Sequence, residues 1–257
     1  MTQIHSTAVV SKKAKIADNV SIGPYSIIED DVEIGNDCKI GPQVVVYNGA
    51  RIGNKVIIHQ GASVSHTPQD LKFSNEESYF YIGDGCVIHE FVTLHRGTKE
   101  TGFSRVGKNC LLMAYSHIAH DNVVGDNCII ANTVQLAGHV TIEDYVIIGG
   151  GTLVHQFCHV GQHSMVGGGY RIPQDVPPFT LMAGEPLKFS GLNVIGLRRR
   201  GFSNDDIQTL KNAYSLIYNK SLNVSQAIVK VKSEFNNKYV DAIVEFIGKS
   251  KRGIVGK

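Results

Sequence analysis

The most regular feature of the sequence is an aliphatic residue at every sixth position. The series runs from Ile4 to Val64, resumes from Ile82 to Leu94, and runs again from Val106 to Ile172, with Ile, Val or Leu at all 26 positions. A helix repeats every 3.6 residues and a half-exposed strand every 2.0, so neither explains a period of six. A hexapeptide repeat with an inward aliphatic side chain is the signature of a parallel β-helix. We therefore expect a triangular prism with three hexads per turn.

The fourth residue after each aliphatic position is mostly small or β-branched, which predicts a second buried row. All five cysteines occupy this position: Cys38, Cys86, Cys110, Cys128 and Cys158. Free cysteine behaves as a small buried hydrophobe. The count is odd and no CxxC pair is present, so the sequence indicates neither a disulfide framework nor a cysteine-based zinc site.

Two interruptions and a change of period divide the chain. The repeat keeps its phase across both interruptions, so residues 66–81 and 97–105 should leave the prism as loops, which are common carriers of function. The proline-rich segment PQDVPPF (173–179) ends the repeat, and from Ser203 the apolar spacing becomes helical. We predict a β-helix over residues 1–190 and a small helical domain over 191–257, which covers one end of the prism.

The amino-acid composition limits the kinds of partner that we expect the protein to bind. The 257 residues carry a net charge of +2 and 19% charged residues, which points to no polyanion partner and so to no nucleic acid. The N-terminal segment has no apolar core of signal-peptide length, and no stretch approaches 18 uninterrupted apolar residues. We expect a cytoplasmic protein without stable membrane insertion.

Candidate chemistry lies in residues 116–157, which hold four histidines. Residues 18 apart share one face of the prism, and successive coils lie about 4.8 Å apart. Ile118, Leu136 and Val154 therefore belong to three stacked strands. The histidines follow or flank these strands and crowd one vertical strip: His117, His120, His139 and His155.

Three interpretations of this strip compete. The histidines could decorate a solvated or packed face, or hold Zn²⁺ in a trimer interface. The third interpretation is general-base catalysis, since a histidine beside a carboxylate is poised near neutral pH. Asp121 adjoins His120, and Gly138 offers an uncrowded backbone N–H at a similar height. A base and an N–H donor are the minimum for acyl transfer to a hydroxyl.

Seven motifs then point to a family. HTPQDLKF, LHRGT, SHIAHD, LAGHV, VHQF, QDVPPF and GLRRRGFS occur in this order over essentially the whole chain. In this the chain resembles the UDP-N-acetylglucosamine O-acyltransferases that open lipid A biosynthesis. The resemblance implies a left-handed coil and a homotrimer with sites between neighbouring prisms. It also implies transfer of an (R)-3-hydroxyacyl group from acyl carrier protein to the 3-hydroxyl of UDP-N-acetylglucosamine (UDP-GlcNAc), with no cofactor and no metal.

The resemblance also implies roles for single residues. His120 would take the proton of the sugar hydroxyl, Asp121 would hold the imidazole, and the Gly138 N–H would stabilise the oxyanion. Gly168, matched through MVGG, would end the acyl groove and set chain length. The residues that would hold the substrate are Asp70, Lys72, His117, His139, His155, Gln156, Asn193, Arg199 and Arg200.

The chain departs from the family pattern at a few positions, and three rival functions compete with acyl transfer to a sugar hydroxyl. Many relatives carry Glu where this chain has Ile195, and Ser65 and His66 are unusual before TPQDLK. Some relatives use a 3-amino sugar acceptor and form an amide. The pathway's N-acyltransferase typically has an extra N-terminal domain, for which hexads that begin at Ile4 leave no room. The second and third rivals are a zinc-dependent β-helical hydratase and a structural scaffold without activity.

Overall fold

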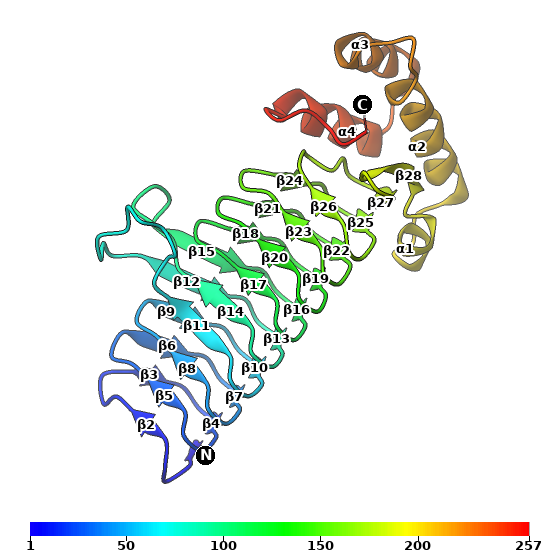
Figure 1. The fold of residues 1–257 in the computed structure, drawn as a ribbon. Helices are drawn as coiled ribbons and strands as arrows, with labels where there is room; N and C mark the ends of the chain where they lie inside the picture. Colours follow the sequence, from blue (N-terminus) through cyan, green and yellow to red (C-terminus); the bar gives the residue numbers. More distant parts are fainter. Residues whose placement is uncertain (257) are drawn as a thin grey trace.

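The protein is a triangular prism of three parallel sheets with helices at its C-terminal end (Figure 1). The structure is a computed structural model that describes residues 1–256. Each strand pairs with the strand one coil below it and the strand one coil above it. We name the three sheets A, B and C in the order in which the chain visits them.

The strands are short, and most contain two residues. Sheet A contains β1 (Gln3–Ile4), β4 (Ser21–Ile22), β7 (Lys39–Ile40), β10 (Ile57–Ile58), β13 (Val87–Ile88), β16 (Leu111–Leu112), β19 (Ile129–Ile130), β22 (Ile147–Ile148), β25 (Met165–Val166), β27 (Thr180–Ala183) and β28 (Lys188–Leu192). Sheet B contains β2 (Val9–Val10), β5 (Ile27–Ile28), β8 (Val45–Val46), β11 (Ser63–His66), β14 (Thr93–His95), β17 (His117–Ile118), β20 (Gln135–Leu136), β23 (Leu153–Val154) and β26 (Arg171–Ile172). Sheet C contains β3 (Lys15–Ile16), β6 (Val32–Ile34), β9 (Ala50–Ile52), β12 (Tyr79–Ile82), β15 (Phe103–Val106), β18 (Val123–Val124), β21 (Thr141–Ile142) and β24 (His159–Val160).

The second residue of each two-residue strand points inward, and this row is the aliphatic series of the sequence. From Ile22 to Ile172 every member of the series is buried. Successive coils stay in step, as Ile118 pairs with Leu136 and Leu136 with Val154. The six-residue period therefore predicted both the strands and their register.

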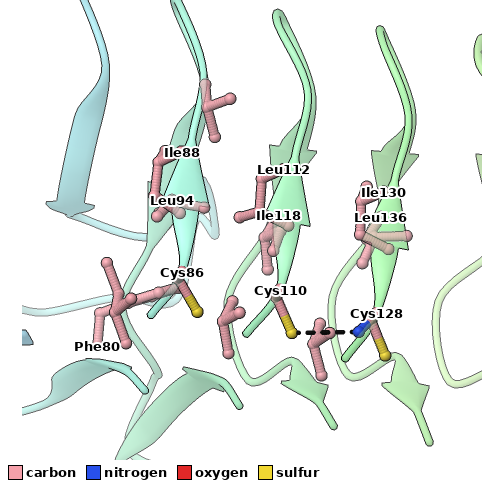
Figure 2. Packing of buried hydrophobic residues seen from close by; sticks show 14 of the residues in the cluster. Phe80, Cys86, Ile88, Leu94, Cys110, Leu112, Ile118, Cys128, Ile130 and Leu136 are labelled. Carbon is pink, nitrogen blue, oxygen red and sulfur yellow. Dashed lines mark hydrogen bonds between the residues drawn. The ribbon is translucent and has the colours of Figure 1, made fainter. Parts of the chain in front are cut away.

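The five cysteines are buried and free, as predicted. Cys86, Cys110 and Cys128 stack on consecutive coils inside the prism (Figure 2). The Cys110 thiol donates to the Gly125 carbonyl at 3.1 Å and accepts the Cys128 N–H at 3.4 Å. These contacts give the Gly125 carbonyl and the Cys128 N–H a side-chain hydrogen-bond partner, which an aliphatic side chain cannot provide.

The two excursions from the prism are shorter than the predicted 66–81 and 97–105. Residues 67–78 and 96–102 leave the coil, whereas the ends of each segment form strands. Tyr79, Phe80 and Tyr81 pair with Phe103, Ser104 and Arg105 on the next coil. The stems of the two loops thus pair with each other, which places the loops side by side on one edge of the prism (Figure 1).

The C-terminal region begins with an antiparallel hairpin and continues as helices. β28 pairs antiparallel with β27 at the end of sheet A. The helices are α1 (Val194–Arg199), α2 (Asn204–Ile217), α3 (Val224–Glu234) and α4 (Lys238–Lys249). Ser203 caps α2 by accepting the Asp206 N–H. α2, α3 and α4 form a second apolar core, distinct from that of the prism.

None of the helices within residues 1–256 is long and apolar enough to span a lipid bilayer.

Candidate active site

The centre of the candidate site is the corner after β17, where His120 and Asp121 follow one another. The corner requires a positive φ of 59° at Asp121, a conformation that aspartate adopts more readily than most residues. This backbone turns the Asp121 carboxylate back toward His120, whose Nδ1 lies 2.7 Å from Oδ2. The sequence predicted this pair.

Asp121 is held by more partners than the sequence indicated. Its buried carboxylate accepts the N–H and the hydroxyl of Thr98, each at 2.9 Å, and the hydroxyl of Thr101. Burial acts to raise the pKa of the Asp121 carboxyl, but hydrogen bonds from His120, Thr101 and Thr98 outweigh it and hold that pKa well below its usual range. Asp121 is therefore ionised and fixed in place.

The ionised carboxylate determines the tautomer of His120. A carboxylate can only accept, so His120 Nδ1 carries the proton and Nε2 keeps its lone pair. The hydrogen bond to Asp121 raises the pKa of His120, although burial opposes it. Nε2 has no hydrogen-bond partner among residues 1–256. The arrangement is that of a base with a free acceptor atom.

Gly138 lies directly against the His120 ring. A Cβ at position 138 would stand 2.6 Å from His120 Cε1 and 2.8 Å from Nε2, so only glycine leaves room for the ring. The Gly138 N–H makes no hydrogen bond to any other described residue. The corner therefore presents an acceptor atom and a free backbone donor close together.

Two further histidines of the strip contact this corner. His139 Nε2 lies 3.6 Å from both Asp121 Oδ2 and Glu100 Oε2, and its ring stacks on Phe157 at 4.6 Å. His117 Nδ1 lies 2.7 Å from the Thr93 hydroxyl, and burial lowers the pKa of His117.

Two cavities meet at His120. The first has a volume of about 610 Å³ and polar walls that include Asp70, Lys72, Glu100, His120, His139 and Gln156. The second has a volume of about 350 Å³ and is lined by His95, His117, His120, Gln135 and Gly138 with Ala119, Leu136, Ala137, Leu153 and Val154. Gln69 and His120 belong to both walls. A hollow of about 630 Å³ over sheet C contains no histidine.

The structure brings most of the sequence-predicted residues to these cavities. Asp70, Lys72, His117, His139 and Gln156 line one or the other. His155 is exposed, its Nδ1 lies 3.0 Å from the Gln156 carbonyl oxygen, and it belongs to neither lining.

The predicted residues of the C-terminal region lie apart from His120 within one chain. Asn193 is buried, caps α1 by accepting the Gly196 N–H, and donates to the His163 carbonyl at 3.0 Å. The Arg200 guanidinium lies 4.9 Å from the centre of the Tyr145 ring, and Arg199 is exposed. α1 lies at the C-terminal end of the prism, away from the loops of its middle (Figure 1). Ile195, where many relatives carry Glu, is 68% exposed on α1.

Gly168 lies at the corner between sheets A and B. A Cβ there would stand 2.8 Å from the Gly150 carbonyl oxygen on the preceding coil. The corner dihedral is carried by Gly169, with φ +79°, so close coil packing rather than conformation explains glycine at 168.

Sequence reasoning missed Thr98, Thr101, His95 and Phe157. Thr98 and Thr101 belong to the loop that interrupts the repeat, so counting by 18 cannot place them on Asp121. His95 occurs in the LHRGT motif, but only the fold shows that its side chain lines the cavity beside His120.

The geometry also tests whether the strip could hold a metal ion. His120, Asp121 and His139 bring one potential ligand atom each within 4.8 Å of one another. Both Asp121 oxygens and His120 Nδ1 are already engaged in hydrogen bonds to each other and to Thr98 and Thr101. A metal ion would have to replace these bonds.

Comparison with known proteins agrees with this geometry. A family model described as "Udp N-acetylglucosamine O-acyltransferase; Domain 2" matches residues 175–255, and one described as bacterial transferase hexapeptide matches 31–66 and 103–138. An acyl-[acyl-carrier-protein]–UDP-N-acetylglucosamine O-acyltransferase of Sulfurihydrogenibium sp. is 56% identical over 99% of this chain and 94% of its own. The chain belongs to the UDP-N-acetylglucosamine O-acyltransferase family.

Solved structures support the same assignment. A UDP-N-acetylglucosamine acyltransferase from Bacteroides fragilis has a TM-score of 0.96 at 44% identity and covers 98% of this chain and 99% of its own. A structure from Acinetobacter baumannii has a TM-score of 0.95 at 43% identity, with the same coverage. The predicted family, the left-handed parallel β-helix with a helical C-terminal region, and the acyltransferase class are confirmed.

Proposed function

We propose that this acyltransferase moves an (R)-3-hydroxyacyl group from acyl carrier protein to the 3-hydroxyl of UDP-GlcNAc, with His120 as the general base. The reaction is the first step of lipid A biosynthesis. The observation that carries the mechanism is the free Nε2 of His120, which the Asp121 carboxylate holds in the correct tautomer beside the Gly138 N–H.

In the proposed step, His120 Nε2 takes the proton of the sugar hydroxyl as its oxygen attacks the thioester carbonyl carbon. The Gly138 N–H donates to the oxyanion that forms. The new C–O ester bond forms, the C–S bond breaks, and His120 passes the proton to the leaving sulfur. Asp121 stabilises the imidazolium between the two transfers.

The two cavities offer different surroundings for the two substrates. The cavity with Asp70, Lys72 and Glu100 has polar walls that can hydrogen-bond a sugar. The cavity with Leu136, Leu153 and Val154 has aliphatic side chains that can cover an acyl chain, beside histidine and glutamine side chains. His120 lies on the boundary, where an acceptor hydroxyl and a thioester have to meet.

A homotrimer forms part of the proposal. From β10 to β27 the outward positions of sheet A form an unbroken apolar ladder: Ile57, Val87, Leu111, Ile129, Ile147, Met165 and Leu181. On sheet C the corresponding positions are mostly charged or polar, among them Glu33, Arg51, Arg105 and Thr141. A half-buried apolar ladder of this length favours a protein partner. A neighbouring chain would also bring Arg199 and Arg200 toward the polar cavity, where guanidinium groups can bind phosphate oxygens.

The cytoplasmic location expected from the sequence remains a prediction, as does independence from any cofactor or metal. The family's donor, acyl carrier protein, and its nucleotide acceptor are the two partners that we propose.

The decisive experiment supplies the purified protein with (R)-3-hydroxyacyl-acyl carrier protein and either UDP-GlcNAc or its 3-amino analogue. We expect an ester product from UDP-GlcNAc, formed at the same rate with and without a chelator. Transfer to the amino sugar alone would show that the acceptor is the 3-amino sugar and not UDP-GlcNAc. Loss of activity with the chelator, restored by Zn²⁺, would show that a metal ion and not a general base drives the reaction.

A further inference from the structure

The residue that the proposed mechanism leaves unused is His95, the last residue of β14. It is 4% exposed and lines the smaller of the two cavities, beside His117 and His120. Its Nδ1 lies 2.6 Å from the Thr67 carbonyl oxygen. A carbonyl oxygen can only accept a hydrogen bond, so Nδ1 carries the proton and Nε2 is the unprotonated nitrogen of the neutral ring.

The surroundings keep the His95 ring neutral. Burial, followed by the neighbouring His117, lowers the pKa of His95 to about 4. The rings of His95 and His117 lie 5.0 Å apart, edge to face. No donor among the described residues reaches Nε2 of His95. His95 therefore presents an atom that can accept a hydrogen bond but cannot donate one.

The cavity in front of this acceptor is lined partly by short and aliphatic side chains, beside the polar side chains of Gln69, Gln135, His117 and His120. The register of β14, β17 and β20 places Ala119 one coil above His95 and Ala137 one coil above Ala119. These two short side chains leave a trough along the corner, and Leu136 and Val154 complete its wall. His120 follows Ala119 directly, so the trough runs beside the proposed base.

We propose that His95 is a specificity-determining residue whose Nε2 accepts a hydrogen bond from the hydroxyl of a hydroxyacyl group in this cavity. The inference rests on the proposed acyl transfer and names the residue that recognises the hydroxyl group of the acyl donor. The part of the wall formed by Ala119, Leu136 and Val154, with His95 as a fixed acceptor beside it, complements an apolar chain that carries one hydroxyl. A sugar ring carries several hydroxyls, and the polar cavity on the other side of His120 offers partners for them.

His117 is the neighbour that could compete for this role. Its Nδ1 faces the Thr93 hydroxyl at 2.7 Å, and a hydroxyl can either donate or accept. The tautomer of His117 is therefore free to change, whereas that of His95 is fixed by Thr67. His95 and His120 thus each present a fixed acceptor to this cavity, and because His120 is the proposed base, His95 is the one left to bind the hydroxyl.

The test compares kcat/KM for a 3-hydroxyacyl donor with that for an unsubstituted acyl donor of equal length. His95→Phe keeps a ring and removes the acceptor. We expect the preference for the hydroxylated donor to fall about 10- to 100-fold, while the rate with the unsubstituted donor stays within about threefold. His95→Gln, which again offers an acceptor oxygen, should restore part of the preference. Thr93→Val, which frees only His117, should leave the preference unchanged.

A third donor makes the test independent of folding of the variants. A 3-fluoroacyl donor resembles the hydroxyacyl donor in size but cannot donate a hydrogen bond. The wild-type protein should treat it as it treats the unsubstituted donor. Equal use of fluoro and hydroxy donors by the wild type, or an unchanged preference in His95→Phe, would overturn the role of His95. Absence of transfer from every donor would instead refute the proposed function.

Discussion

At the scale of single residues, the site depends on His120, whose tautomer and pKa are determined by the neighbouring Asp121. His120→Ala removes the base but touches none of the inward aliphatic row. Loss of a general base typically reduces the rate by about 10²–10⁴-fold. We expect kcat to fall by at least this factor while the melting temperature stays that of the wild type. His5→Ala, at an exposed histidine of the first coil, is the matched control. Near-normal turnover of folded His120→Ala would refute the mechanism.

The pH profile provides a separate test of the Asp121 contact. The base must be neutral, so kcat/KM should fall as pH drops through the pKa of His120. Because the hydrogen bond to Asp121 raises that pKa, the midpoint of this acid limb should lie above the usual value for histidine. In Asp121→Asn the charge is lost, the pKa of His120 falls, and the midpoint should move to lower pH although the maximal rate drops. An unmoved midpoint would show that Asp121 does not tune the base.

The same corner shows what counting along the sequence could and could not predict. The 18-residue arithmetic placed His117, His120 and Gly138 together because all three lie on regular coils. Thr98 is 23 residues from Asp121, since a loop intervenes, and no period predicts a contact across an irregular segment. Its hydroxyl nevertheless determines how firmly the carboxylate is held.

At the scale of secondary structure elements, the six-residue period predicted strands of sheets A, B and C because burial repeats with every coil. It overestimated the loops, since Tyr79–Tyr81 and Phe103–Arg105 pair with each other rather than extend the excursions. The apolar spacing did not predict α1, because this helix has only 6 residues and carries Arg198 and Arg199 in its last turn. Asn193 can be recognised as the N-cap of α1 only once the preceding hairpin of β27 and β28 is known.

The turns of the prism also bear on acyl chain length. The smaller cavity beside His120 crosses sheet B past Leu153, which pairs with Arg171 on the next coil, and Gly168 lies in the corner just before Arg171. A side chain at 168 fills space in that corner, and overpacking costs about 1–3 kcal/mol, or one to two orders of magnitude in rate. Gly168→Met should therefore shift the preference toward shorter donors in a competition assay with mixed acyl carrier protein donors.

The close contact with Gly150 calls for a matched control of this variant. Gly168→Ala places the same Cβ 2.8 Å from the Gly150 oxygen but adds no length. It should lower the melting temperature about as much as Gly168→Met and change the chain-length ranking far less. If Gly168→Met keeps the wild-type ranking, then Gly168 serves coil packing alone.

At the scale of the whole molecule, the contrast between the faces of the prism predicts assembly. Sedimentation equilibrium should give three times the 28.0 kDa of one chain. Ile129→Lys places a charge within the apolar ladder of sheet A and should reduce the mass to that of one chain and abolish activity. Thr141→Lys makes the matched change on sheet C and should alter neither. A fully active single chain would contradict the proposed trimer and the shared site.

The one-coil stacking described for the fold has a consequence for where stability resides. Each coil gains hydrogen bonds and apolar contacts only from the coils directly below and above it, so order is transmitted along a line. Ile4 in the first coil is 48% exposed, whereas the aliphatic row is buried from Ile22 onward, so this end of the prism is packed least tightly and frays most easily. The coils of His120 and Gly138 have intact neighbours on both sides. The candidate site thus lies in the middle of the prism. Fraying at the N-terminal end would have to disrupt each intervening coil in turn before it disturbed His120.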